Sequence, residues 1–133
     1  MSHHILVVED EPDINKTVSY NLANEGFHPV SALNLQEADA QLSSNNISLI
    51  ILDLMLPDGS GLDFCKILKS SNIYKNIPVI IVTAKGDEVD KVVGFELGAD
   101  DYVTKPFSVR ELMLRIKAIS VSYTHLRAHE TDR

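Results

Sequence analysis

The chain has 133 residues, of which 44% are hydrophobic and 23% charged, and a formal net charge of −7 at pH 7. This composition is typical of a single soluble domain with a buried core. An acidic surface without clusters of lysine and arginine argues against direct binding of nucleic acid. The apolar runs are far shorter than the roughly 20 residues that span a bilayer, and no basic leader precedes a long apolar stretch. We therefore expect a cytoplasmic domain with no nucleic-acid or membrane contact of its own.

Strand-like apolar runs alternate with helical patterns along the chain. The predicted strands are residues 5–8, 27–31, 49–52, 79–82 and 101–103. The predicted helices carry apolar residues at helical spacing and cover residues 14–22, 35–42, 62–68, 89–97 and 112–119. Ser108 and Glu111 form a capping-box pattern ahead of the last helix. Five strand–helix units predict an α/β fold with helices on both faces of a parallel sheet.

Polar residues follow four of the predicted strands directly. In a doubly wound five-stranded sheet with five helices we expect the flavodoxin-like strand order 2-1-3-4-5, whose ligands bind beyond the carboxyl ends of strands 1 and 3. Glu9 and Asp10 follow the first strand, Asp53 the third, Thr83 the fourth and Lys105 the fifth. The sequence therefore predicts three carboxylates, a hydroxyl and an ammonium at one edge of the sheet.

Three clustered carboxylates repel one another unless a cation lies among them. Carboxylates and water are the ligands that Mg²⁺ prefers, together with phosphate oxygens, and Mn²⁺ is an alternative ion for such a site. Asp53 follows the apolar run "SLIIL", and a carboxylate there must be paired or emerge at the crevice. A carboxylate beside such an ion can attack phosphorus, while Lys105 and Thr83 supply an ammonium and a hydroxyl to the phosphoryl group.

Four segments together resemble a known family. "ILVVEDEPDI", "LDLMLPDGSGLDFC", "IPVIIVTAKG" and "GADDYVTKPFSVREL" are similar to the successive signature segments of the receiver domain of bacterial two-component response regulators. The resemblance covers residues 4 to about 120. It implies that a sensor histidine kinase phosphorylates Asp53. It also implies a protein that assists its own phosphorylation and dephosphorylation and is not a turnover enzyme on external substrates.

The resemblance also implies roles for single residues at the metal. Asp10, Asp53 and the backbone carbonyl of Met55 would be metal ligands. Glu9 would complete the acid pair through a water molecule.

Other roles concern the phosphoryl group. Thr83 and Lys105 would contact it, and Tyr102 would change rotamer when Thr83 moves. The Lys105–Pro106 bond resembles the cis peptide of the family, and only X-Pro bonds adopt the cis form at modest cost.

Within the family the chain most resembles the OmpR/PhoB class, whose full-length members carry a winged-helix DNA-binding domain. This implies a homodimer in the phosphorylated state, and its face would consist of Lys91, Glu96, Asp100, Asp101, Glu111, Arg115 and Lys117. The implied cross-subunit ion pairs are Lys91 with Glu111 and Asp101 with Arg115. The alternatives are an ordinary solvated charged face, and a stand-alone CheY-like signalling module that acts by docking to another protein.

Three rival classes fit the sequence less well. A haloacid dehalogenase phosphatase needs an aspartate two residues after its nucleophile, where this chain has Met55. A dinucleotide-binding module needs a glycine-rich turn after the first strand, where this chain has "EDEPD". A docking module that never accepts phosphate would not require both Asp53 and Lys105.

Two further acids near these motifs have structural explanations. Glu11 belongs either to a more distant part of the site or to the first turn of the helix after Pro12, and we favour the helix because negative charge suits a helix N-terminus. Asp58, between Pro57 and Gly59, is typical of a turn.

The last residues, 121–133, depart from the pattern before them. Residues 121–124 are poor helix formers, and the apolar stripe ends at Ile119. His125 and His129 are four residues apart, but no third ligand accompanies them in a zinc-site pattern. "VSYTHLRAHET" resembles the translation of a sequencing-library adapter, which implies an assembly artefact. We therefore expect a receiver domain over residues 1–120, an idle tail, and an effector domain that has been cut away.

Overall fold

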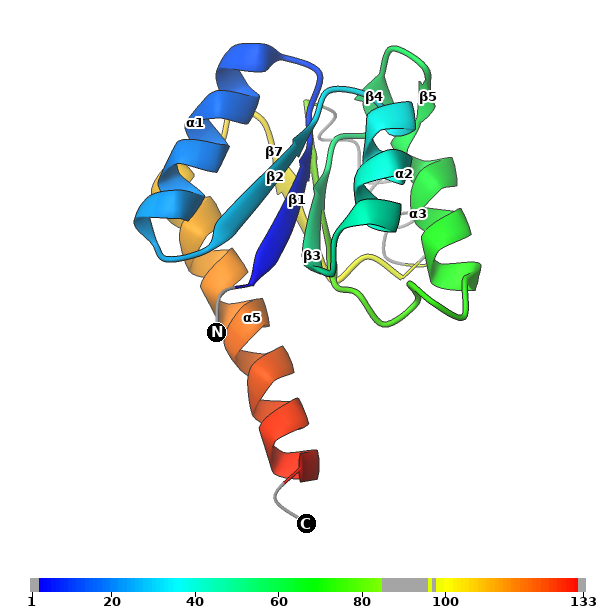
Figure 1. Cartoon of the computed structure of the whole chain (residues 1–133). Coiled ribbons are helices and arrows are strands. Elements are labelled where there is room, and N and C mark those ends of the chain that lie inside the picture. Colours follow the sequence, from blue (N-terminus) through cyan, green and yellow to red (C-terminus); the bar gives the residue numbers. More distant parts are fainter. Residues whose placement is uncertain (1–2, 85–95, 97, 132–133) are drawn as a thin grey trace.

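The computed structural model describes residues 3–84, 96 and 98–131, and side chains as far as residue 120. Its centre is a five-stranded parallel sheet in the order β2-β1-β3-β6-β7 (Figure 1). The strands are β1 His4–Val8, β2 His28–Ala32, β3 Ile47–Leu52, β6 Val79–Thr83 and β7 Asp101–Thr104. Counted along the chain within this sheet, the order is 2-1-3-4-5, which confirms the predicted topology.

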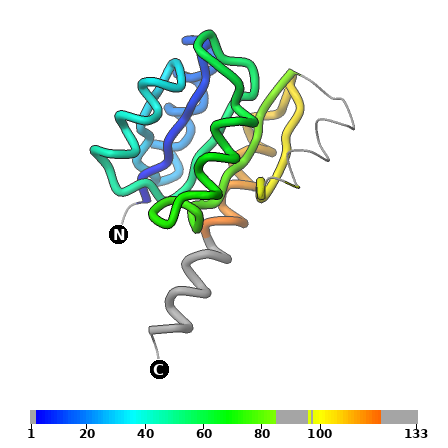
Figure 2. Tube along the Cα trace, turned by 90° about the vertical axis from the view of Figure 1, so that its right-hand side faces the viewer, coloured from blue at the N-terminus to red at the C-terminus, as the bar shows by residue number. Residues whose placement is uncertain are grey.

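Helices cover both faces of the sheet. They are α1 Pro12–Asn24, α2 Leu35–Ser44, α3 Gly61–Ser70 and α5 Val109–Thr131. Buried residues of α1 and α5 pack in one core cluster, and those of α2 and α3 pack in the other. Figure 2, turned by 90° from Figure 1, shows α2 and α3 in front of the sheet.

Strand residues alternate between the two core clusters. Ile5 and Val7 of β1 belong to the cluster under α1 and α5, whereas Leu6 and Val8 belong to the cluster under α2 and α3. Successive side chains of a strand point to opposite faces, so a strand covered on both sides is apolar throughout. The continuous run of aliphatic residues in β1 therefore reflects burial on both faces.

The predicted strands all lie in the sheet, with ends displaced by one or two residues. The predicted helix over residues 89–97 falls in the part of the chain, residues 85–95 and 97, that lies outside the described residues. Two short strands were not predicted: β4 Met55–Leu56 and β5 Gly59–Ser60 pair as an antiparallel hairpin. Strands of two residues are too short to show a periodic pattern, which explains the omission.

The last helix is longer than the apolar pattern predicts. Ser108 Oγ accepts a hydrogen bond from Glu111 N–H at 3.3 Å, as the capping-box pattern predicts. Leu112 and Ile116 are fully buried, and Ile119 packs against the same cluster. The helix nevertheless runs on to Thr131. Residues 107–133 contain no proline or glycine to interrupt backbone hydrogen bonding, so the end of the stripe does not end the helix.

Across the described ranges, no helix is both long and apolar enough to cross a membrane.

Candidate functional site

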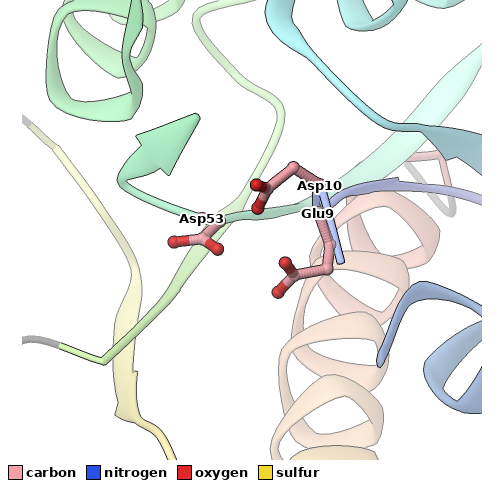
Figure 3. A group of neighbouring side chains, drawn as sticks. All are labelled: Glu9, Asp10 and Asp53. Atoms are coloured by element: carbon pink, nitrogen blue, oxygen red, sulfur yellow. The ribbon is translucent and has the colours of Figure 1, made fainter. Parts of the chain in front are cut away.

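Three carboxylates meet beyond the carboxyl ends of β1 and β3 (Figure 3). One oxygen from each of Glu9, Asp10 and Asp53 lies within 4.8 Å of the others. Glu9 and Asp53 are buried, each with 4% of its surface exposed. The structure thus brings together the three acids predicted at this edge.

The sheet itself holds two of these acids in position. The Asp53 N–H donates to the Val8 carbonyl at 3.0 Å, and the Glu9 N–H donates to the Ala32 carbonyl at 3.0 Å. These bonds extend the parallel ladders by one residue beyond each strand. Strand pairing therefore fixes the backbone of both acids.

Lys105 lies among the acids. Its Nζ is 2.7 Å from Glu9 Oε1, 3.0 Å from Asp53 Oδ2 and 3.6 Å from Glu11 Oε1. It follows β7, and its backbone N–H donates to the Thr83 carbonyl at 2.8 Å. The Lys105–Pro106 peptide bond is cis, as the resemblance implied. Lys105 is therefore the counter-ion of the acidic cluster in this structure.

Burial and ion pairing shift the pKa values of Glu9 and Lys105 in opposite directions. Burial raises the pKa of Glu9 to about 7, although the hydrogen bonds from Lys105 and from the Glu11 N–H both act to lower it. Burial alone would lower the pKa of Lys105, but its hydrogen bonds to Glu9 and Asp53 hold the pKa above its usual value. Lys105 therefore stays charged at every physiological pH.

A pocket of about 410 Å³ opens beside these groups. Of the predicted site residues it is lined by Asp10, Asp53, Met55, Thr83 and Lys105. Its wall also includes apolar and turn residues from the loops that follow β3 and β6. A small anionic group placed here would contact carboxylate, hydroxyl and ammonium groups together.

The donor set fits a hard divalent cation. Mg²⁺ takes oxygen ligands, usually one or two carboxylates together with water and phosphate oxygens. Three carboxylates within ligand reach, two of them buried, match that preference. Met55 lines the same pocket, and its N–H donates to Asp53 Oδ1 at 3.2 Å. The residues present are therefore suited to Mg²⁺ or Mn²⁺.

Thr83 and Tyr102 lie on neighbouring strands. Thr83 is fully buried at the end of β6, and Tyr102 is buried in β7. Ile81 pairs with Tyr102 and Thr83 with Thr104, so the Thr83 and Tyr102 side chains share one face of the sheet. The two side chains of the predicted switch pair therefore lie on the same side of the sheet.

Several residues of the predicted dimer face have partners in their own chain. Arg115 Nη1 lies 2.8 Å from both carboxylate oxygens of Asp101, and Nη2 lies 3.2 Å from Glu111 Oε2. The pair that we expected between subunits, Asp101 with Arg115, thus forms within one chain here. Glu96 is exposed, and Lys91 lies outside the described residues.

Asp100 and Lys117 are also engaged within the chain. Asp100 Oδ2 accepts from the Val79 N–H at 2.8 Å and lies 3.6 Å from Lys69 Nζ. Lys117 forms an ion pair with Glu25 at the end of α1. These three contacts tie strands, loops and helices of the same domain together.

Glu11 lies one position before the helix that we expected it to join. It is the N-cap residue of α1, where its side chain makes no capping bond, and Asp13 is the acid of the first turn. Its carboxylate is 61% exposed at 3.6 Å from Lys105. Both interpretations of Glu11 are thus partly correct.

Asn15 is a buried site neighbour that the sequence interpretation missed. The predicted apolar stripe of this helix, Ile14, Val18 and Leu22, does pack in the core cluster, Ile14 being partly buried, but Asn15 is buried beside it as well. The Asn15 amide donates to the Glu9 carbonyl at 3.0 Å. The spacing 15–18–22 fits a helical stripe as well as 14–18–22, and this was the available signal.

Comparison with known proteins identifies the family. The family model of the response regulator receiver domain matches residues 5–117. The chain belongs to this family. Among curated proteins, the receiver domain is 51% identical over 119 residues to the phosphate regulon transcriptional regulatory protein PhoB of Klebsiella pneumoniae. The match covers 90% of this chain and 52% of that protein, so the chain spans about half the length of this relative.

Solved structures agree with the family. A putative response regulator from Chloroflexus aurantiacus is 33% identical, with a TM-score of 0.85, and the match covers 91% of this chain and 99% of that one. A BeF3-activated DrrB receiver domain is 36% identical, with a TM-score of 0.79, covering 89% of this chain and 97% of that one. The predicted family and fold are both confirmed.

Proposed function

We propose that this receiver domain accepts a phosphoryl group on Asp53 from a sensor histidine kinase in the cytoplasm. The observation that supports this most is a buried carboxylate 3.0 Å from an ammonium, in a pocket shared with a second acid and a hydroxyl. A carboxylate oxygen of Asp53 attacks the phosphorus of a phosphohistidine, and the P–N bond breaks with its electron pair left on the imidazole nitrogen. The product is an acyl phosphate on Asp53.

Asp10, Asp53 and the Met55 carbonyl are our assigned ligands for Mg²⁺, with Glu9 acting through a water molecule. When bound, the ion supplies positive charge to the equatorial oxygens of the transferring group. The Lys105 ammonium contacts the same oxygens once its side chain turns from Asp53 toward the phosphoryl group. The Thr83 hydroxyl donates a hydrogen bond to the same group.

The proposed output follows from the Thr83 and Tyr102 pair. A phosphoryl group on Asp53 draws the Thr83 hydroxyl toward it, and the buried Tyr102 side chain changes rotamer in response. This change favours the conformation in which two copies of the domain dimerise through β7, α5 and the predicted helix over residues 89–97. The DrrB receiver domain, 36% identical to this chain, is known in a BeF3-activated form, which supports the proposal that such a domain can be activated.

We further propose that the whole protein regulates transcription. The relative named PhoB is a transcriptional regulatory protein, and the chain spans about half of its length. On this proposal, residues 1–120 are the receiver unit, residues 121–133 are a foreign tail, and a DNA-binding effector domain follows in the complete protein. DNA contact then belongs to that domain and not to the acidic receiver.

Labelling with a small phosphodonor tests the proposed site. Acetyl phosphate with Mg²⁺ should add one hydroxylamine-labile phosphate to the wild-type protein and none to Asp53→Asn. Asp10→Asn should fold normally but lose most of its Mg²⁺ affinity in calorimetric titration, because a hard anionic ligand is gone. Equal labelling of Asp53→Asn, or unchanged Mg²⁺ affinity in Asp10→Asn, would refute the corresponding assignment.

A further inference from the structure

The β4–β5 hairpin is anchored at its base against Asp53. Met55 pairs with Ser60, and the Gly61 N–H donates to the Leu54 carbonyl at 2.9 Å. A Cβ atom at Gly61 would lie only 2.2 Å from the Asp53 carbonyl oxygen, so the chain directly after β5 packs against the backbone of Asp53. This close approach requires glycine at position 61.

The tip of the same hairpin is bonded to another helix. Asp58 Oδ1 accepts from the Leu35 N–H at 2.9 Å, and Asp58 Oδ2 accepts from the Gln36 N–H at 3.0 Å. Both N–H groups lie in the first turn of α2, where no carbonyl of the same helix can accept from them. The local cap of this helix, Asn34, accepts only from the Glu37 N–H, at 2.7 Å. The Asp58 carboxylate is therefore a second cap, supplied from a distant part of the chain.

A short segment with restricted backbone freedom connects Asp58 to Met55 at the site. Three residues before Asp58, the Met55 N–H donates to Asp53 Oδ1 at 3.2 Å. Pro57 lies between them, and its ring fixes one backbone torsion of the connection. A displacement of the tip therefore moves Met55 relative to Asp53.

We propose that Asp58 is a positioning residue for the phosphoacceptor centre. By bonding the hairpin to α2 it holds Met55 in the orientation in which its N–H bonds Asp53 and its carbonyl is presented to the divalent ion. This inference rests on the proposed function, since it assigns a support to the proposed ligand set. Because coupling between two sites is reciprocal, Mg²⁺ binding also stabilises the contact between Asp58 and α2.

The test measures phosphorylation by acetyl phosphate at a series of Mg²⁺ concentrations. We expect Asp58→Ala to raise the half-saturating Mg²⁺ concentration by about tenfold, at the lower end of the effect of losing a ligand's support. The rate at saturating Mg²⁺ should change by less than about twofold, because Asp53 and Lys105 remain. Asp58→Asn retains one acceptor oxygen and should fall between the wild type and Asp58→Ala.

Two control variants separate positioning from simple destabilisation. Asn34→Ala removes the local cap of α2 and destabilises the same helix, but leaves the hairpin bonded to it. Asp39→Asn removes the same charge from an exposed position of α2. Both should keep the half-saturating Mg²⁺ concentration of the wild type. An unchanged value in Asp58→Ala, or an equal increase in Asn34→Ala, would overturn the inference.

A second measurement does not depend on phosphorylation. Calorimetric titration with Mg²⁺ alone should show the same loss of affinity in Asp58→Ala, and hydrogen exchange at Leu35 and Gln36 should slow on Mg²⁺ addition in the wild type only. If the wild type is never phosphorylated but Asp58→Ala still weakens Mg²⁺ binding, the proposed function fails and the positioning role stands. If Mg²⁺ binds both proteins equally, the positioning role fails.

Discussion

Asn15 joins α1 to the strand ends that carry the site. Its Nδ2 lies within 3.3 Å of the Val7, Glu9 and Ala32 carbonyls, and its Oδ1 accepts from Ser31 Oγ at 2.8 Å. The amide thus satisfies backbone carbonyls where β1 and β2 end. We infer that it fixes the backbone immediately before Asp10.

Asn15→Ala should lower the free energy of unfolding by about 1–3 kcal/mol, because it leaves buried polar groups without their partner. Urea denaturation measures this change. Asn24→Ala, at an exposed position on the same helix, should change the free energy by less than about 0.5 kcal/mol. Equal stability of Asn15→Ala and the wild type would show that the amide is dispensable.

Single residues differed in how well the sequence revealed them. The location of Asp53 was predictable because an acid directly after four apolar strand residues has few alternatives to a crevice. The role of Asn15 was not predictable, although its position fits a helical stripe. A buried polar residue can be assigned a role only when its partners are known, and these carbonyls lie at the ends of two strands. The intrachain partner of Arg115 was hidden for the same reason.

At the scale of elements, the contact between the hairpin and α2 predicts a pH effect. The backbone N–H groups of Leu35 and Gln36 donate to Asp58 and hold the pKa of its carboxyl below the usual value. A lowered pKa in the folded state stabilises the protein above the unfolded-state pKa, and this contribution is lost as the pH falls through the folded-state pKa. The wild type should therefore be more stable than Asp58→Asn at pH 7.

The stability difference between these two proteins should shrink as the pH falls from about 5 to about 3. Urea midpoints at each pH measure it, and the comparison cancels the other carboxylates. A difference that is constant over this range would mean that the ionised carboxylate of Asp58 does not stabilise the fold.

The end of α5 gives a second prediction at this scale. Among the residues of α5 whose side chains the structure describes, the buried ones are Leu112, Met113 and Ile116. Deleting residues 122–133 should change the melting temperature by less than about 3 °C, whereas Ile116→Ala should destabilise the fold by about 2–5 kcal/mol. A large loss of thermal stability on deletion would contradict the idle tail.

Elements were predictable where periodicity was strong. The five strands of the sheet and the helices α1, α2 and α3 each carry an apolar pattern long enough to define them. The β4–β5 hairpin does not, since each strand has two residues and depends on Gly61 packing against Asp53. The length of α5 differed from expectation because an apolar stripe predicts only the part of a helix that packs against a core, whereas helical backbone hydrogen bonding does not require such a stripe.

For the whole molecule, the intrachain pairs on β7 and α5 bear on dimerisation. Arg115 binds Asp101 and Glu111 of its own chain, so a symmetric dimer must exchange or extend these pairs. The exposed pair of Arg115 with Glu111 contributes only about 0–1 kcal/mol, so its exchange costs little, whereas the Asp101 side chain is only 21% exposed. The exposed pair therefore suits a face that assembles reversibly.

Phosphorylation should increase the mass measured by light scattering toward that of a dimer. Arg115→Ala should weaken this increase, and Asp53→Asn should remain a monomer with or without acetyl phosphate. No mass change in the phosphorylated wild type would favour the alternative function, a stand-alone signalling module that docks to another protein.

If Asp53, and not a neighbouring acid, receives the phosphoryl group, the acyl phosphate forms at position 53. Borohydride reduces an acyl phosphate to the corresponding alcohol with release of phosphate, so a phosphorylated aspartate becomes homoserine. After treatment with acetyl phosphate and Mg²⁺, peptide mass spectrometry should find homoserine at position 53. Homoserine at position 10 instead, or labelled protein that borohydride leaves unchanged, would mean that Asp53 is not the phosphoacceptor.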